Sequence, residues 1–220
     1  MTVPHAKCCF AIISTMSLER ARKIKLLLFD VDGVLTDGTI WLFPAPAGAQ
    51  LSTPQHARQH GGEGGFGFVS QSMVEAKGFH AHDGTAISLT RLAGIKTGLI
   101  TKRISETVAL RARDLKLDHA YQGIQDKLTV FEEILAKEGL RPEQAAYVGD
   151  DVIDLPVMRN CGLAVAVANA RTEVKEEAHY ITEHGGGHGA LRDAVEYILK
   201  AQGKWEEVVR EYTRERSPAK

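Results

Sequence analysis

Residues 25–38 read Lys-Leu-Leu-Leu-Phe-Asp-Val-Asp-Gly-Val-Leu-Thr-Asp-Gly, and this stretch decides the fold. The apolar run Lys25–Phe29 ends abruptly in the carboxylates Asp30 and Asp32, which is typical of a buried parallel strand with an acidic tip. Ligands of open α/β sheets bind outside the carboxyl ends of such strands. Two carboxylates one residue apart repel each other unless a cation or a shared proton compensates. The pair therefore indicates a metal site; the simpler alternative is a strand followed by a polar turn, with Gly33 for the bend.

Composition limits the class of protein. The chain has 220 residues, 44% of them hydrophobic and 25% charged, which fits one α/β domain with a small accessory element. A net charge of −1 gives no reason to expect nucleic acid or an anionic membrane as a partner. The three cysteines have neither metal-ligand spacing nor a disulfide framework, so we expect a cytoplasmic protein.

The N-terminal residues contain a short apolar run after Lys7, too short to span a membrane and without a small-residue cleavage site. We expect residues 1–23 to form a flexible extension, or Met16 to be the true initiator, so that residues 1–15 would not belong to the mature protein.

A hairpin is predicted over residues 39–80. Thr39–Phe43 is rich in β-branched and aromatic residues, and Val69–His80 can return beside it. Between them, the Gly/Pro-rich segment 44–68 is predicted to be a mobile loop. Its glycine cluster, residues 61–67, suggests a phosphate-binding loop, but no Gly-Lys-Ser/Thr follows, so a flexible hairpin tip is the better interpretation.

From residue 83 onwards the sequence alternates between strand and helix patterns. We expect strands at Lys96–Thr101, His119–Gln122, Ala145–Gly149, Ala164–Ala168 and Tyr180–Thr182. We expect helices at Thr85–Ala93, from Ser105 as N-cap to about Leu115, from Lys127 to Gly139, at Thr172–Ala178 and at Ala190–Gln202. Such alternation predicts a Rossmannoid α/β fold over residues 24–203, in which helices cover a central parallel sheet. The tail 204–220 is predicted to be helical, with an apolar face that packs on its own core or on a second subunit.

Reactive side chains follow several predicted strands or open helices. In a parallel sheet these ends meet at one edge, so residues far apart in sequence can share one crevice. They are Asp30, Asp32, Thr101, Lys127, Asp150 and Asp151. Carboxylates gathered there repel one another at neutral pH, and one Mg²⁺ resolves this because it prefers oxygen ligands. A hydroxyl and an ammonium facing that ion suit a phosphoryl group.

The ordered set of motifs resembles a known family. Residues 30–34, Thr101, Lys127 and the segment 149–154, Gly-Asp-Asp-Val-Ile-Asp, resemble the four motifs of the haloacid dehalogenase (HAD) phosphatase superfamily. The fuller match, from residue 25 to 203, resembles the capless 3-deoxy-D-manno-octulosonate 8-phosphate (KDO8P) phosphatases. It rests on residues 29–38, 83–84, 103 with 111–112, 122–127, 147–158 and 186–192. This resemblance implies a HAD-like three-layer fold with a β-hairpin in place of a cap domain.

The resemblance also implies a mechanism with an aspartyl-phosphate intermediate. Asp30 would attack phosphorus, and Asp32 would protonate the leaving sugar oxygen and then activate water. Thr101 and Lys127 would hold the phosphoryl oxygens. The Mg²⁺ ligands would be Asp30, the backbone carbonyl of Asp32, and Asp150. Asp151 and Asp154 would orient that metal shell.

Substrate contacts are expected around the same crevice, at Asp32, His80, His82, Asp83, Gly84, Lys102, Arg103, Arg111, Lys127 and His188. Three of these positions depart from the family pattern: His82 and His188 stand where the family has arginine, and Lys102 where it has glycine. Arginine pairs with carboxylates through a planar fork, so these exchanges are not conservative. The substrate carboxylate would then be held differently, for example by Lys102, or the substrate would be another sugar phosphate. As alternate residues of a strand, His80 and His82 would face the same way, as two zinc ligands do. No third ligand has convincing spacing, so a contact with the substrate is the better interpretation.

The expected partner is a small phosphorylated sugar acid. The alternatives are a sialic-acid-like nonulosonate 9-phosphate, a promiscuous range of sugar phosphates, and a catalytically silent binding protein. A phosphorylated signalling receiver uses similar residues, but its acidic pair lies on the first strand and its acceptor on a middle one. The resemblance further implies lipopolysaccharide biosynthesis and a homotetramer in which a neighbouring subunit closes each site.

Overall fold

The computed structural model describes residues 16–47, 66–67 and 73–215. At its centre is a six-stranded sheet in which every neighbouring pair is parallel, in the order β10-β9-β8-β1-β5-β7. The strands are β1 (Leu26–Phe29), β5 (Lys96–Thr101), β7 (His119–Gln122), β8 (Ala145–Gly149), β9 (Leu163–Ala166) and β10 (Tyr180–Ile181). The alternating strand and helix pattern thus correctly predicted a parallel α/β sheet.

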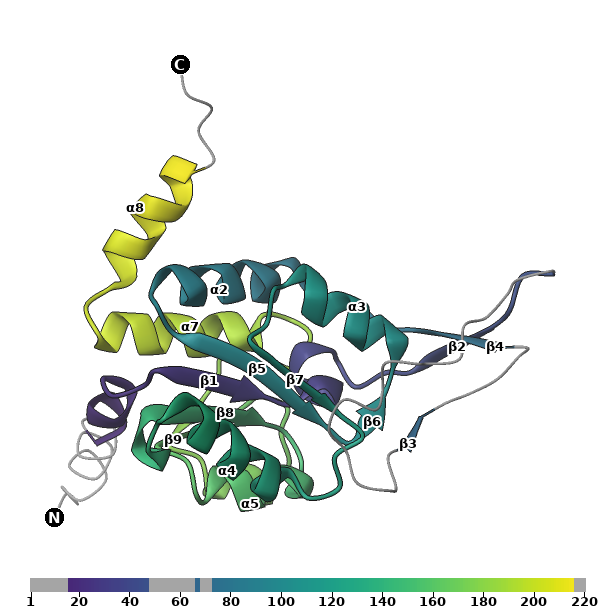
Figure 1. Ribbon diagram of the computed structural model, residues 1–220, viewed down its shortest axis with the longest axis horizontal. Coiled ribbons are helices and arrows are strands. Elements are labelled where there is room, and N and C mark those ends of the chain that lie inside the picture. The colour runs from purple at the N-terminus through teal and green to yellow at the C-terminus, as the bar shows by residue number, and fades with distance from the viewer. Residues whose placement is uncertain (1–15, 48–65, 68–72, 216–220) are drawn as a thin grey trace, which may run out of the picture.

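Helices cover both faces of the sheet and make three layers. One face carries α2 (Ala81–Leu92), α3 (Glu106–Asp114) and α7 (Ala190–Ala201), and the other carries α4 (Lys127–Glu138) and α5 (Leu155–Met158) (Figure 1). Short helical segments η2 (Pro142–Gln144) and α6 (Thr172–Glu176) complete the connections. The helix α8 (Trp205–Glu215) contacts α2 and α7, and its Val208 is 5% exposed. Its apolar face therefore packs on its own core, one of the two partners expected.

The core is built around β1, whose four residues are all buried. It lies between β5 and β8, with Leu26 paired with Lys96 on one side and Ala145 on the other. A central strand needs apolar side chains on both faces, which explains the continuous apolar run in the sequence. The carboxyl end of β1 consequently opens in the middle of the sheet edge.

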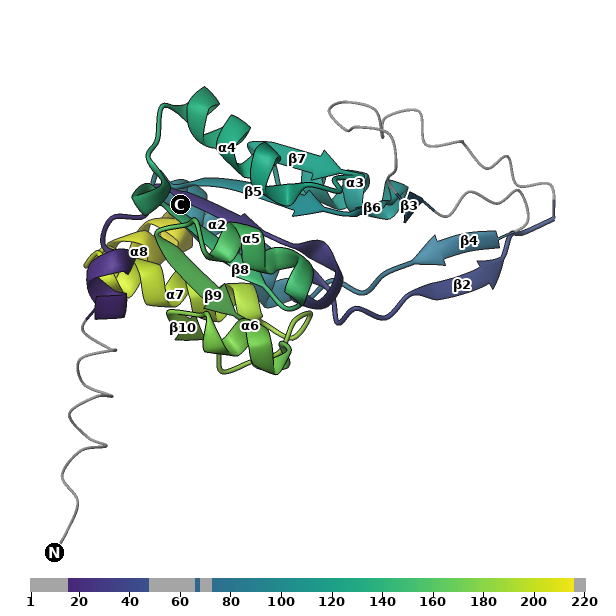
Figure 2. The ribbon, with the colours of Figure 1, turned by 90° about the horizontal axis from the view of Figure 1, so that it is seen from below.

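The hairpin extends from the body of the molecule (Figures 1 and 2). Strand β2 (Trp41–Pro44) is antiparallel to β4 (Met73–Ala76), with Trp41 opposite Ala76. The two-residue strands β3 (Phe66–Gly67) and β6 (Arg103–Ile104) pair in parallel, so the end of the inserted segment lies beside the loop after β5. The hairpin prediction is confirmed; the predicted mobile loop 44–68 lies largely outside the described residues.

Three local predictions differ from the structure. Residues 16–21 are helical, with Ser17 and Ala21 buried, so this part of the predicted flexible extension packs on the body; residues 1–15 lie outside the described part. Helix α2 begins at Ala81 rather than Thr85. His82 therefore lies in the first helical turn and His80 is its N-cap, so the two do not share a strand face. No helix within the described ranges is long and apolar enough to span a bilayer.

Candidate active site

Asp30 lies where β1 ends and the π-helical turn η1 (Val31–Leu35) begins. Its Oδ1 accepts a hydrogen bond from the Val31 N–H at 2.7 Å, and the residue is 3% exposed. Gly33 in this turn has φ of 92°, and a Cβ at that position would lie 2.1 Å from Oδ2 of Asp150. Glycine is thus required for the loop after β1 to approach the loop after β8.

Three carboxylates gather at this edge of the sheet. Ligand atoms of Asp30, Asp150 and Asp154 all lie within 4.8 Å of one another. Asp150 and Asp154 come from the loop after β8 and the short 3₁₀ turn η3 (Val152–Asp154) that follows. The sequence predictions named Asp30, Asp150 and Asp154, and the structure brings these three together.

Burial and mutual repulsion favour protonation of two of these carboxyls. Burial, outweighing attraction to Lys127, and the neighbouring Asp154 raise the pKa of Asp30 to about 7. Burial, together with Asp154, Asp30 and Asp151, raises the pKa of Asp150 to about 8. The cluster therefore carries more negative charge than its surroundings can stabilise at neutral pH.

The chemistry of this cluster fits Mg²⁺. Oδ1 of Asp150 is buried and has no hydrogen-bond partner among the described residues. A hard cation that coordinates this oxygen would compensate for the missing hydrogen bond. Asp151, expected near the metal, is exposed; its carboxylate accepts from the Val152 N–H at 2.7 Å and is not part of the cluster. The expected role of the Asp32 carbonyl as a ligand stays a prediction.

Lys127, the first residue of α4, neutralises part of the cluster. Its Nζ lies 3.0 Å from Oδ2 of Asp30 and 2.7 Å from Oδ1 of Asp154, and the residue is 3% exposed. Burial alone would lower the pKa of Lys127, but Asp30 and Asp154 outweigh it and raise that pKa. The ammonium is therefore a fixed positive charge beside the carboxylate at the end of β1.

Asp154 connects these parts. It is fully buried, and its Oδ1 also accepts from the Tyr147 hydroxyl at 2.9 Å. Its Oδ2 accepts from the Asp150 N–H at 3.0 Å. One carboxylate thus fixes both the Lys127 ammonium and the loop that carries Asp150. The sequence did not point to Tyr147, because a tyrosine inside an apolar strand is ordinarily a core residue.

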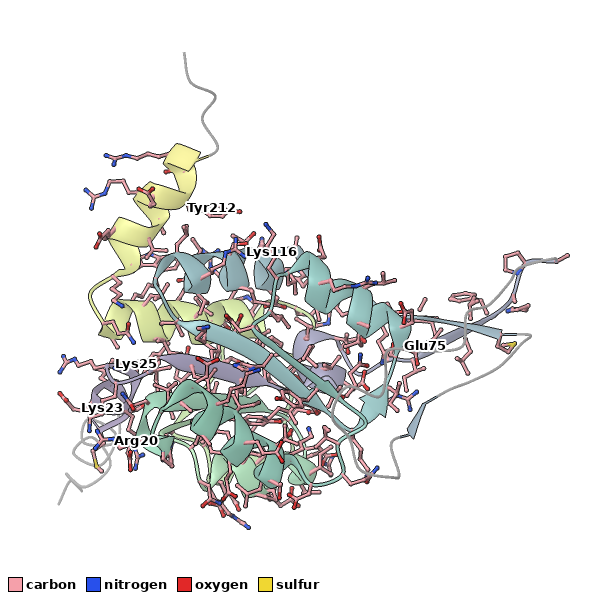
Figure 3. The ribbon with its side chains drawn as sticks, in the orientation of Figure 1. Arg20, Lys23, Lys25, Glu75, Lys116 and Tyr212 are labelled. Atoms are coloured by element: carbon pink, nitrogen blue, oxygen red, sulfur yellow. The ribbon has the colours of Figure 1, made fainter. Side chains whose placement is uncertain are left out.

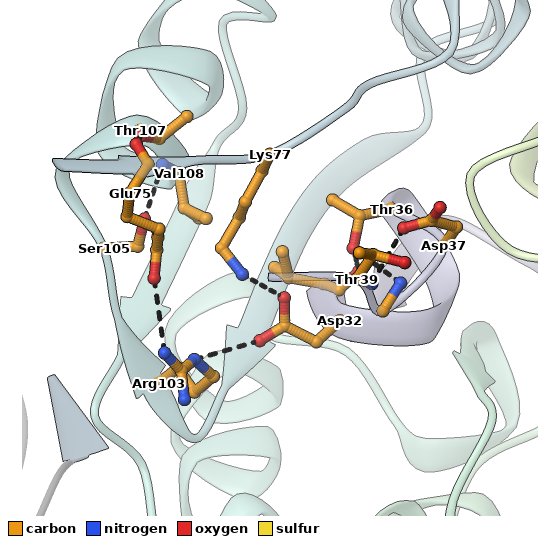
Figure 4. Close-up of polar contacts among 12 residues, drawn as sticks. Asp32, Thr36, Asp37, Thr39, Glu75, Lys77, Arg103, Ser105, Thr107 and Val108 are labelled. Atoms are coloured by element: carbon orange, nitrogen blue, oxygen red, sulfur yellow. Dashed lines mark hydrogen bonds and ion pairs between the residues drawn. The ribbon is translucent and has the colours of Figure 1, made fainter. Parts of the chain in front are cut away.

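Asp32 faces a different set of partners. One oxygen pairs with the Lys77 ammonium and the other lies 3.5 Å from Nε of Arg103 (Figure 4). Arg103 in turn pairs with Glu75 at 3.2 Å. The predicted contact residue Arg103 therefore lies beside Asp32, whereas Lys77 and Glu75 were not predicted. Charged residues on a hairpin arm usually face solvent, so nothing in the sequence distinguished them.

Thr101 ends β5 and is 3% exposed. Phe29 pairs with Leu99 in the register of β1 and β5, which places Thr101 at the same edge as the turn after Asp30. Lys102 follows in the bend between β5 and β6 and is half-buried. Both residues thus lie at the expected edge of the sheet.

Several predicted substrate contacts form a second group, around the N-terminus of α2. Oδ1 of the fully buried Asp83 accepts from the Arg192 N–H at 3.1 Å, and burial raises the pKa of Asp83. The rings of His80 and His82 lie 4.7 Å apart, edge to face. The Arg111 guanidinium pairs with Asp114 at 2.5 Å. Further contacts of Arg111 are the Phe79 ring, 5.5 Å away, and Gly84, where a Cβ would lie 2.7 Å from Nη2.

The glycine-rich turn before α7 packs against the loop after β1. The Gly187 N–H donates to the Val34 carbonyl at 2.9 Å, and a Cβ on Gly186 would lie 1.7 Å from the Gly33 carbonyl oxygen. His188 is exposed on this turn. A Cβ on Gly189 would lie 4.0 Å from Nδ1 of His80, so the turn connects the two groups of predicted residues.

Sequence comparisons identify relatives along most of the chain. Residues 116–192 match the model of the haloacid dehalogenase-like hydrolases. The 3-deoxy-D-manno-octulosonate 8-phosphate phosphatase KdsC of Salmonella typhi is 37% identical over 199 residues, which are 90% of this chain and 92% of the relative. KdsC of Escherichia coli K12 is also 37% identical over 199 residues, with the same coverage.

Solved structures agree with the sequence matches. A HAD superfamily (subfamily III A) hydrolase from Legionella pneumophila superposes with a TM-score of 0.77 at 34% identity, covering 94% of this chain and 99% of the other. The KDO8P phosphatase of Moraxella catarrhalis, in complex with magnesium ion, phosphate ion and KDO, gives 0.74 at 32% identity, covering 89% and 97%. By its sequence, its fold and this site, the chain belongs to the haloacid dehalogenase-like hydrolases and is a phosphatase of the KdsC-like family.

Proposed function

We propose that this protein is a Mg²⁺-dependent phosphatase that converts 3-deoxy-D-manno-octulosonate 8-phosphate to KDO and phosphate. The observation that carries the proposal is the gathering of Asp30, Asp150 and Asp154 around the Lys127 ammonium at the end of the central strand. The relatives described above, one of them solved with magnesium, phosphate and KDO, support the choice of metal and of substrate.

In the proposed reaction, Asp30 attacks phosphorus in line and forms an aspartyl-phosphate. The phosphorus–oxygen bond to the sugar breaks, and Asp32 delivers a proton to the leaving oxygen. Water then attacks the phosphoryl group and gives its proton to Asp32, which releases phosphate and regenerates Asp30. Lys127 and Thr101 hold the phosphoryl oxygens.

Mg²⁺ would be held by Asp30, Asp150 and the backbone carbonyl of Asp32. When bound, it would offset the negative charge of the cluster and of the phosphoryl oxygens. Asp154 keeps Asp150 and Lys127 in place, and Asp151 lies outside this group.

The test of the mechanism is phosphate release by the wild type with Mg²⁺, by the wild type after EDTA, and by Asp30→Asn. We expect the wild type to lose activity with EDTA and regain it with Mg²⁺, and Asp30→Asn to be inactive. Activity that survives both the chelator and the substitution would contradict the mechanism. A silent binding protein would release no phosphate under any of these conditions.

The substrate assignment has its own test. The second candidate is a nonulosonate 9-phosphate or a wide range of sugar phosphates, because His82, Lys102 and His188 stand where the KDO8P phosphatase pattern has other residues. Steady-state kcat/KM across a panel of phosphorylated sugars and sugar acids separates these candidates. We expect KDO8P to give the highest value; a flat profile would contradict the assignment.

We further propose that the protein works in the cytoplasm, in lipopolysaccharide biosynthesis, and assembles as a homotetramer through its hairpins. The exposed side chains of Ile40, Trp41, Leu42 and Phe43 on the hairpin support a partner at that surface. Light scattering of the purified protein, beside a Trp41→Glu variant, tests the assembly. A monomeric wild type would contradict it.

A further inference from the structure

The two carboxylate oxygens of Asp32 each have a cation beside them. Oδ1 accepts a hydrogen bond from Lys77, and Oδ2 forms an ion pair with Arg103 at 3.5 Å. The backbone of Asp32, with φ of −77° and ψ of 113°, departs from the helical turn around it. Figure 4 shows the carboxylate pointing toward these two cations, and Asp32 is not a member of the cluster of Asp30, Asp150 and Asp154.

Lys77 is buried in an unusual way for a lysine on a hairpin arm. Its side chain has no exposed surface, while that of Asp32 is 21% exposed. A buried ammonium is costly unless an anion compensates for its lost hydration. Among the described residues, Asp32 is the carboxylate that does so. The ammonium and the carboxylate therefore fix each other's positions.

The second cation is itself restrained. Arg103 pairs with Oε2 of Glu75 at 3.2 Å, and Oε1 of Glu75 accepts from the Ser105 hydroxyl at 2.5 Å. Ser105 is the N-cap of α3, where its Oγ accepts from the Val108 N–H. Glu75 lies on β4, and Lys77 is the first residue after that strand. This arm of the hairpin therefore restrains Asp32 directly through Lys77 and indirectly through Glu75 and Arg103 (Figure 4).

We propose that Lys77 is a positioning residue for Asp32, and that Glu75 assists it by restraining Arg103. The inference rests on the proposed function, in which Asp32 transfers the proton. Lys77 holds the Asp32 carboxyl where its proton can pass to the sugar oxygen as the phosphorus–oxygen bond breaks. The same placement lets Asp32 take a proton from the attacking water in the second step. Lys77 itself contacts Asp32 and needs no contact with substrate.

The nature of the leaving group separates this role from a structural one. A sugar hydroxyl is a weak acid, so its oxygen must receive a proton as it leaves. Nitrophenolate is a much better leaving group and departs with little help. A misplaced Asp32 therefore slows cleavage of a sugar phosphate far more than cleavage of p-nitrophenyl phosphate, whereas a distorted site slows both.

The experiment compares Lys77→Met with the wild type, in saturating Mg²⁺, on KDO8P and on p-nitrophenyl phosphate. If KDO8P is not hydrolysed, the best substrate of the sugar phosphate panel replaces it. We expect kcat on the sugar phosphate to fall about 100-fold, as for a misplaced proton donor. We expect kcat on the aryl phosphate to change by less than about threefold, since it needs little proton transfer.

Three further variants complete the design. Lys77→Arg keeps the cation and should recover part of the loss on the sugar phosphate. Glu75→Gln should give the same pattern as Lys77→Met, with a smaller effect, because it releases Arg103 without touching Asp32. Lys137→Met removes an exposed lysine on α4 and should leave both activities unchanged.

Equal losses on the two substrates would overturn the inference. If Lys77→Met does not fold by circular dichroism, Glu75→Gln decides in the same way, and equal losses there overturn it too. A wild type that releases no phosphate from any ester contradicts the proposed function instead. The two failures are therefore distinguishable.

Discussion

At the scale of single residues, Asp154 holds three parts of the site in place. It fixes the Lys127 ammonium, the Tyr147 hydroxyl and the loop that carries Asp150. We expect Asp154→Asn to lower activity about 10- to 100-fold and to raise the Mg²⁺ concentration needed for half-maximal rate, as for residues that orient metal ligands. Titration of activity with Mg²⁺ measures both. Asp151→Asn is the matched control. An equal effect of the two substitutions would contradict the positioning role of Asp154.

The sequence pointed to the site residues that follow strands and missed those that reach the site from elsewhere. Asp30, Thr101 and Asp150 were found because the ends of parallel strands converge. Lys77 could not be found, because its partner Asp32 lies 45 residues away and only the folded hairpin brings them together. Pairing between distant side chains has no periodic pattern along the chain.

At the scale of elements, the N-terminus of α4 determines where Lys127 lies. The carboxylate of Asp126, the N-cap, accepts from the N–H groups of Leu128 and Thr129 at 3.1 and 3.2 Å. We expect Asp126→Ala to lower both the melting temperature and kcat, because the frayed helix start would no longer hold Lys127. The control is Glu132→Ala, an exposed position on the same helix. A lower melting temperature with unchanged kcat would contradict the link to Lys127.

Helix ends were predicted well where a cap marked them and less well at the start of α2. Ser105 as N-cap of α3 and Gly139 after α4 both lie where the sequence indicated. Helix α2 was expected to begin at Thr85, but it begins at Ala81, so Gly84 lies inside its first turn, where a Cβ would lie 2.7 Å from Nη2 of Arg111. A glycine required for close packing cannot be distinguished from a helix breaker in the sequence alone.

At the scale of the whole molecule, we expect the acidic cluster to make stability depend on pH and on Mg²⁺. The pKa values of Asp30 and Asp150 rise from 3.8 to about 7 and about 8 in the folded protein. Between these limits the folded state binds more protons than the unfolded state, so the free energy of unfolding falls as pH rises from about 4 to about 8. We expect Mg²⁺ to raise the melting temperature, and to do so more at pH 8 than at pH 5. Thermal melts with Mg²⁺ and with EDTA at both pH values measure this, and an equal increase at both would contradict it.

The alternation of strands and helices predicted the layers of the molecule but not the order of strands in its sheet. The continuous apolar run of β1 indicated a buried strand but not which strands would lie beside it. The structure places it between β5 and β8, with residue 26 beside residues 96 and 145. Figure 3 shows Glu75, on the hairpin strand β4, far across the molecule from Lys25, which directly precedes β1. The arrangement depends on packing among distant segments, which local sequence does not report.

The central place of β1 has a consequence for the timing of synthesis. The strand that leads to Asp30 is made early, but its neighbour β8 and the loop with Asp150 and Asp154 are made much later. Pairing of such distant segments is slow to form, because a long stretch of chain must first be closed into a loop. A ribosome-bound fragment that stops before residue 145 would leave one side of β1 unpaired, with its carboxylate lacking its acidic neighbours. Enzymatic competence therefore arises late, as one of the last properties the growing chain acquires.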